Sequence, residues 1–226
     1  MSSNTFSLID ALSAEVFYQT EGIFYKPLFD FEAKIGSLHR FYILTLAVSR
    51  KYQAESLASL TIETAKKRDA ELLDVHHDIT SNDLEYFGKF VLSSSLTHLF
   101  SAYESLLQEL IEEMRGKVKV DAPLSKDNIP LVNRYIKWLR DYGGCKVELS
   151  KESNCLFDIL REIRNRFIHG KGGDFPEQMR NKLLELRASA LEQGAGEEEY
   201  LVFLAFRVIG QSAKQVELAF LRQMNT

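Results

Sequence analysis

The sequence has few of the residues that interrupt helices or cross-link loops. It contains 4 prolines and 12 glycines among 226 residues, and this shortage favours a few long helices over many turns. Its 2 cysteines, Cys145 and Cys155, are too few for a disulfide framework or a four-ligand zinc site. Both are therefore expected to be free thiols in a reducing cytoplasm.

Long apolar runs and the common phosphate and hydrolase motifs are also missing. No run of about 18 apolar residues predicts a membrane-spanning helix, and the first five residues lack the basic and apolar parts of a signal peptide. We therefore expect a cytoplasmic protein with no membrane partner. There is no glycine-rich phosphate loop, no His-Glu-x-x-His and no Gly-x-Ser-x-Gly. The net charge of -4 gives no overall attraction to nucleic acid, so RNA binding would need a local basic patch.

What the sequence does contain is apolar residues at helical spacing. With 45% apolar and 27% charged residues it has the composition of a soluble globular protein. No alternating strand pattern occurs, so we predict an all-α bundle of about six to eight helices. Residues 1–80 are expected to form an N-terminal helical extension packed on residues 81–226, whose first helix begins at the capping cluster Ser81-Asn82-Asp83. The predicted helices cover residues 5–20, 29–54, 57–79, 84–115, 131–139, 151–169 or 154–169, 176–191 and 200–224. Gly143-Gly144 is expected to close the fifth of these, and Ser150 or Ser153 to cap the sixth, whose buried stripe is Leu156, Leu160, Ile163 and Phe167.

The long fourth helix carries two neighbouring stripes besides its apolar face. One stripe consists mostly of small residues and would let another helix approach closely, with His98 as a packed interface residue: Val91, Ser95, His98, Ala102 and Ser105. The other stripe is polar and is predicted to be a solvated face: Ser94, Thr97, Ser101, Glu104 and Gln108.

Potential chemistry is concentrated in residues 161–173, where three arginines precede His169 and a glycine-rich stretch. The spacing i, i+4 places Asn165 and His169 on one helical face, so the amide can orient the ring. Arg164 precedes His169 by five residues, about 140° round an ideal helix. The two side chains can therefore meet at one phosphate only if the helix bends or ends, or if a second copy takes part.

These residue types suit cleavage of RNA without a metal. A histidine can accept the proton of a ribose 2'-hydroxyl or protonate the departing 5'-oxygen. The guanidinium of Arg164 can hold the scissile phosphate and stabilise its added charge. Arg161, Arg166 and Lys171 would add a positive field for the RNA backbone. Arg166 also lies four residues after Glu162, and this spacing favours a structural ion pair over a catalytic role.

The pattern Arg-Asn-x-x-x-His at 164–169, placed after an apolar helix and before Gly170, resembles that of the HEPN superfamily. The resemblance covers roughly residues 85–220. It implies a metal-independent endoribonuclease that leaves 2',3'-cyclic phosphate and 5'-hydroxyl ends. Arg164 and His169 would be catalytic, Asn165 would orient the histidine, and Glu104 would support the site from an earlier helix.

The same resemblance implies partners and a biological setting. HEPN ribonucleases usually bring two motifs together, so a homodimer with a composite active site is expected. The substrate would be RNA, the setting toxin–antitoxin or antiphage defence, and an antitoxin or regulatory protein a further partner. HEPN toxins controlled by a nucleotidyltransferase often carry Tyr two residues after the histidine, whereas this sequence has Lys171 there.

Two other interpretations remain open. The domain could be a non-catalytic HEPN-like helical module that binds a nucleotide, RNA or protein. It could also be an all-α metal phosphohydrolase of HD type, with His76-His77-Asp78 joined by His39 and Asp158 as ligands. A solvated, charged helix face is the more ordinary explanation of the His-Asp dipeptide at residues 77–78. The leading interpretation requires neither a metal nor a cofactor.

Overall fold

The computed structural model describes residues 26–67, 70–126, 129–168, 181 and 197–225. Within that part of the chain the protein has five helices and no strand, so the all-α prediction is confirmed. The helices are α2 (Lys26–Lys67), α3 (Ala70–Val118), α4 (Leu131–Asp141), α5 (Lys151–Ile168) and α7 (Glu197–Met224). The helices expected at 5–20 and 176–191 lie outside the described residues, so the count of six to eight stays a prediction.

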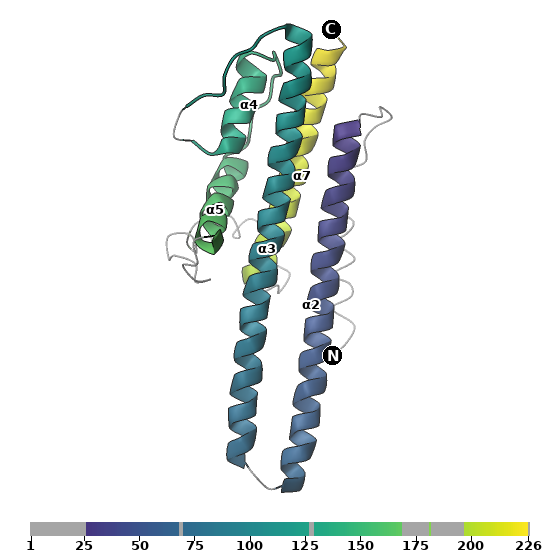
Figure 1. Ribbon diagram of the computed structural model, residues 1–226, viewed down its shortest axis with the longest axis vertical. Helices are drawn as coiled ribbons and strands as arrows, with labels where there is room; N and C mark the ends of the chain where they lie inside the picture. Colours follow the sequence, from purple (N-terminus) through teal and green to yellow (C-terminus); the bar gives the residue numbers. More distant parts are fainter. Residues whose placement is uncertain (1–25, 68–69, 127–128, 169–180, 182–196, 226) are drawn as a thin grey trace.

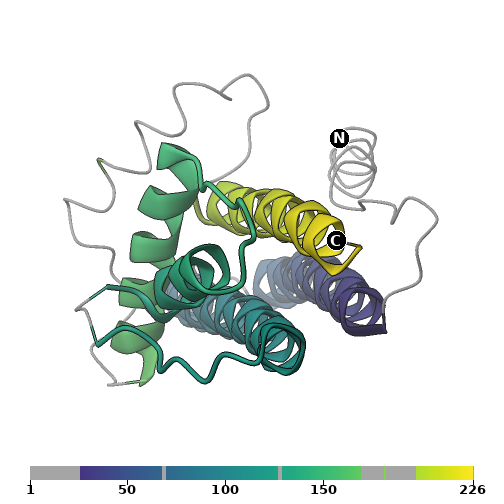
Figure 2. The same ribbon diagram turned by 90° about the horizontal axis from the view of Figure 1, so that it is seen from above.

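Helix α3 is the centre of the bundle and packs against each of the other four described helices. Seen from above, α2 lies on one side of the pair α3 and α7, and α4 and α5 lie on the other (Figure 2). In this view α5 is seen largely from its side, so it crosses the bundle steeply. None of the described helices has the length and apolarity that crossing a membrane requires.

Helices α2 and α3 form an antiparallel hairpin that is longer than the rest of the bundle. At ~1.5 Å per residue, α2 and α3 are about 60 and 75 Å long, whereas α7 is about 40 Å. Figure 1 shows the far end of the hairpin projecting beyond α5 and α7. Much of α2 and the first half of α3 therefore have only each other as neighbours among the described helices.

Two predicted helix boundaries are wrong. Helix α2 is continuous from Lys26 to Lys67 and does not break after Ala54. Helix α3 begins at Ala70 and runs through Ser81-Asn82-Asp83, which therefore do not cap a helix. Asn82 and Asp83 point to solvent, where such polar residues are tolerated in a helix interior. The division of the chain at residue 80 stays a prediction, although α3 passes through it.

The two glycines predicted to close the short helix do so. The backbone amide of Gly143 donates to the carbonyl of Trp138 at the end of α4. A Cβ atom on Gly143 would lie 2.7 Å from the carbonyl oxygen of Leu139, so the chain needs glycine there. Gly144 then adopts φ +70°, the left-handed conformation that ends many helices.

Tyr103 of α3 joins four helices in the core. Its side chain is fully buried, and its hydroxyl forms a hydrogen bond with Ser212 of α7. Its ring stacks on Phe157 of α5 at 5.7 Å and lies 5.9 Å from Phe31 of α2. Burial raises the pKa of the Tyr103 hydroxyl, so this group stays neutral.

Candidate functional site

Helix α5 carries the start of the Arg-Asn-x-x-x-His motif, and its first turn is capped as predicted. The amide of Ser153 donates to Ser150 Oγ at 3.0 Å, which satisfies one of the free amides of the first turn. The predicted apolar stripe is also confirmed at Leu156, Leu160 and Ile163, all of which are buried. The side chain of Phe167, the fourth member, lies outside the described residues.

The substitution Ser150→Ala is expected to destabilise the protein by about 1 kcal/mol, because it leaves that amide without its acceptor. Thermal unfolding measures the effect as a fall in Tm of several degrees. Ser59→Ala is the matched control, because Ser59 is exposed inside α2, away from both helix ends. Equal Tm values for the two variants would show that Ser150 contributes no cap.

Aromatic packing fixes α5 against α3. Besides its stacking on Tyr103, the ring of Phe157 lies 6.0 Å from Phe100 of α3. Arg164 follows Phe157 by seven residues, and seven residues make about two helical turns. The backbone of Arg164 therefore lies on the same face of α5 as Phe157, about 10 Å further along. The side chain of Arg164 lies outside the described residues.

The described neighbours of Arg164 have distinct environments. Arg161 is half-buried and Asn165 is exposed. Arg166 Nε donates to Glu162 Oε1 at 3.2 Å, so the predicted i, i+4 ion pair is confirmed. That contact holds the Arg166 side chain on the surface of α5, and its predicted part in a positive field for RNA stays a prediction. His169 and Lys171 lie outside the described residues, and their predicted roles stay predictions.

Glu104 lies beside α4. Its side chain is half-buried on α3. Burial and then the Glu104 carboxylate raise the pKa of the Tyr135 hydroxyl on α4. Figure 1 shows α5 running from the level of α4 towards the first half of α3. Glu104 therefore lies closer to the beginning of α5, at the level of α4, than to the last turn of α5.

Thr97, which the sequence places in the solvated polar stripe, is a half-buried residue of α3. It precedes Phe100 by three residues and so shares the face that packs on α5. Thr97 Oγ1 is buried and has no hydrogen-bond partner among the described residues. A buried hydroxyl without a partner is uncommon. Thr97 therefore joins the candidate residues along the line of contact between α3 and α5.

The two predicted stripes of α3 differ from their description in the sequence. Only Gln108 of the polar stripe is exposed, and Ser94, Thr97, Ser101 and Glu104 are half-buried. His98 is exposed, so its prediction as a packed interface residue is wrong; its Nδ1 lies 2.8 Å from the Ser94 carbonyl. How far each of these side chains is exposed depends on which neighbouring helices pack against α3. The spacing of residues within one helix does not show that packing.

The residues proposed for an HD-type metal site have separate environments. His39 is buried on α2 with its ring 5.0 Å from Phe206 of α7, and Asp158 is exposed on α5. Figure 2 shows α2 and α5 on opposite sides of α3 and α7. The side chains of His76 and His77 lie outside the described residues. Among the described residues no group of three or more His, Cys, Asp or Glu side chains converges.

Comparison with models of known protein families, with curated proteins and with solved structures gave no match to this chain.

Proposed function

We propose that the protein is a metal-independent endoribonuclease of HEPN type. The observation that carries the proposal is the position of Arg164 and Asn165 near the C-terminal end of α5, which ends at Ile168, one residue before His169. Phe157 packs this helix firmly on α3 at the centre of an all-helical bundle. A rigid helix is a suitable support for a guanidinium and an imidazole that must be placed accurately.

The reaction follows from the chemistry of these two groups. His169 accepts the proton of a ribose 2'-hydroxyl while the 2'-oxygen attacks the adjacent phosphorus. The bond from phosphorus to the 5'-oxygen breaks, and that oxygen takes up a proton. The products are a 2',3'-cyclic phosphate and a 5'-hydroxyl. Arg164 binds the non-bridging oxygens, on which negative charge grows in the transition state.

The geometry of a single helix supports a composite site. Arg164 and His169 are separated by about 140° on an ideal helix, so a straight α5 does not direct both at one phosphate. Asn165, which is exposed, shares the face of His169 by its i, i+4 spacing. We propose that the motifs of two copies meet, so that one copy supplies the arginine and the other the histidine.

The products test this function. Purified protein is incubated in EDTA with an end-labelled RNA and with the same strand in which every ribose is 2'-deoxy. We expect the RNA to be cut to fragments with 2',3'-cyclic phosphate and 5'-hydroxyl ends, and the deoxy strand to stay intact. Cleavage that needs a divalent cation would contradict the mechanism. Binding of RNA without cleavage would favour a non-catalytic helical module.

The resemblance to HEPN toxins supports a role in toxin–antitoxin or antiphage defence. In such a setting the nuclease would need a restraining partner, an antitoxin or a regulatory protein. Lys171 occupies the position at which nucleotidyltransferase-controlled toxins carry tyrosine. We therefore propose control by a bound protein and not by modification at that position.

A further inference from the structure

Helix α2 has a second apolar face that the other described helices leave uncovered. One face of the helix is buried in the core through Phe31, Ile35 and Tyr42. A different face carries four large apolar side chains at spacings of three and four residues, with exposed fractions of 58, 64, 60 and 65%: Phe41, Leu44, Val48 and Tyr52. A soluble surface helix usually has a single apolar face, so a second one indicates a second contact.

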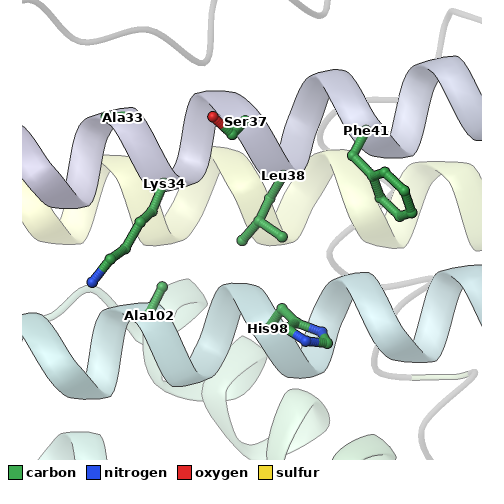
Figure 3. A pocket seen from close by; sticks show the side chains of 7 residues that line it. All are labelled: Ala33, Lys34, Ser37, Leu38, Phe41, His98 and Ala102. Carbon is green, nitrogen blue, oxygen red and sulfur yellow. The ribbon is translucent and has the colours of Figure 1, made fainter.

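A groove between α2 and α3 continues this exposed stripe. Its volume is about 600 Å³, and Figure 3 shows Leu38 and Phe41 of α2 facing Ala102 and His98 of α3 across it. Phe41 belongs to both the stripe and the groove. We call the two together the α2 surface, defined by Ala33, Lys34, Ser37, Leu38, Phe41, Leu44, Val48, Tyr52, His98 and Ala102.

The α2 surface is large enough for an interface between two chains. Large apolar side chains exposed to this extent present roughly 100 Å² each. With the smaller groove residues they supply about 600–800 Å² per copy, so two copies would bury about 1,200–1,600 Å², the range of stable protein interfaces. Alanine and serine in the groove let a helix approach closely.

We propose that the α2 surface binds the α2 surface of a second copy, with the two α2 helices antiparallel and the two-fold axis near Val48. About this axis Leu44 of each copy lies opposite Tyr52 of the other, and the groove of each copy lies opposite residues 55–63 of the other, where Ile62 is exposed. Arg40 and Glu55 are both exposed and lie eight and seven residues from Val48 on opposite sides. The antiparallel arrangement therefore forms two pairs of opposite charge, whereas a parallel one would place arginine against arginine.

This interface is separate from the proposed active site. Helix α5 lies on the opposite side of α3 from α2 (Figure 2), so pairing of the α2 surfaces does not bring two α5 ends together. A chain that uses both contacts would form an assembly larger than a dimer. Loss of the α2 contact alone should halve the assembly mass and preserve cleavage of RNA.

Sedimentation at micromolar concentration tests the contact in the full chain. Leu44→Glu is expected to halve the mass of the wild-type assembly, because it places two carboxylates in the apolar interface. Leu218→Glu is the matched control, because Leu218 is an exposed apolar residue of α7. Thermal unfolding confirms that both variants fold. A Leu44→Glu protein with the wild-type mass would overturn the proposal.

Charge exchange and cross-linking test the orientation. Glu55→Arg should raise the dissociation constant about tenfold, and adding Arg40→Glu in the same chain should restore it. With diamide as oxidant, Val48→Cys should give a disulfide-linked dimer on a non-reducing gel, whereas Leu218→Cys and the wild type should not. Equal cross-linking of the two cysteine variants, or no restoration by the double variant, would overturn the antiparallel arrangement.

Discussion

Tyr103→Ala is expected to lower the free energy of unfolding by about 3–5 kcal/mol, the usual cost of removing a large buried aromatic side chain. The tyrosine is fully buried where α2, α3, α5 and α7 meet. Its removal would leave a cavity lined by Phe31 and Phe157 and would deprive the Ser212 hydroxyl of its partner. Helices that cross at fixed positions cannot close such a space fully.

Urea unfolding measures this loss, and Tyr103→Phe separates its two components. The phenylalanine keeps the aromatic contacts and removes only the hydroxyl that bonds to Ser212. Its expected cost is therefore about 1 kcal/mol. A loss below about 1 kcal/mol for Tyr103→Ala would show that the junction of the four helices is not a tightly packed core.

Arg164→Ala is expected to reduce the rate of RNA cleavage about 100- to 1,000-fold. The reason is the loss of the group that stabilises charge on the phosphate in the transition state. Arg164→Lys should restore only part of the rate, because an ammonium does not reproduce the two parallel hydrogen bonds of a guanidinium. Cleavage is measured under single-turnover conditions in EDTA, so that the rate reports the chemical step.

Arg166→Ala is the matched control for Arg164→Ala. The two arginines lie on the same turn of α5, and each substitution removes one positive charge. Arg166 already donates to Glu162, so its removal should change the cleavage rate by less than tenfold. Equal losses in the two variants would mean that general positive charge, and not a placed guanidinium, supports cleavage.

Features of the fold that depend on local chemistry were predicted from the sequence. The cap at Ser150, the buried stripe of α5 and the end of α4 at Gly143-Gly144 each follow from residues within about one turn. The Arg166–Glu162 pair was predicted on the same basis. These contacts depend on hydrogen bonds and helical spacing, which a sequence displays directly.

The sequence does not predict the length of the hairpin, because its polar clusters resemble helix boundaries. Ser81-Asn82-Asp83 resembles an N-cap, yet the residues on either side are helical and the cluster lies within α3. Packing of α2 along α3 supports one continuous helix at that point. Once a helix has formed, extending it costs less than starting a new one.

The surroundings of the candidate site could not be predicted from the sequence, because they depend on how the helices pack together. The exposed state of His98, the buried hydroxyl of Thr97 and the proximity of Glu104 to Tyr135 are set by helices distant in sequence. The second apolar face of α2 has the same origin. Helical spacing alone does not distinguish its residues from the core face, and only the placement of α3 and α7 shows that they remain exposed.

The most direct measurement of the proposed function is the rate of RNA cleavage in EDTA by the wild-type protein and by His169→Ala, purified identically and matched in Tm. We predict cleavage by the wild type and a loss of at least about 100-fold in the variant, because the group that accepts the 2'-hydroxyl proton is gone. Cleavage at the same rate by His169→Ala, or none by the wild type, would contradict the proposed function.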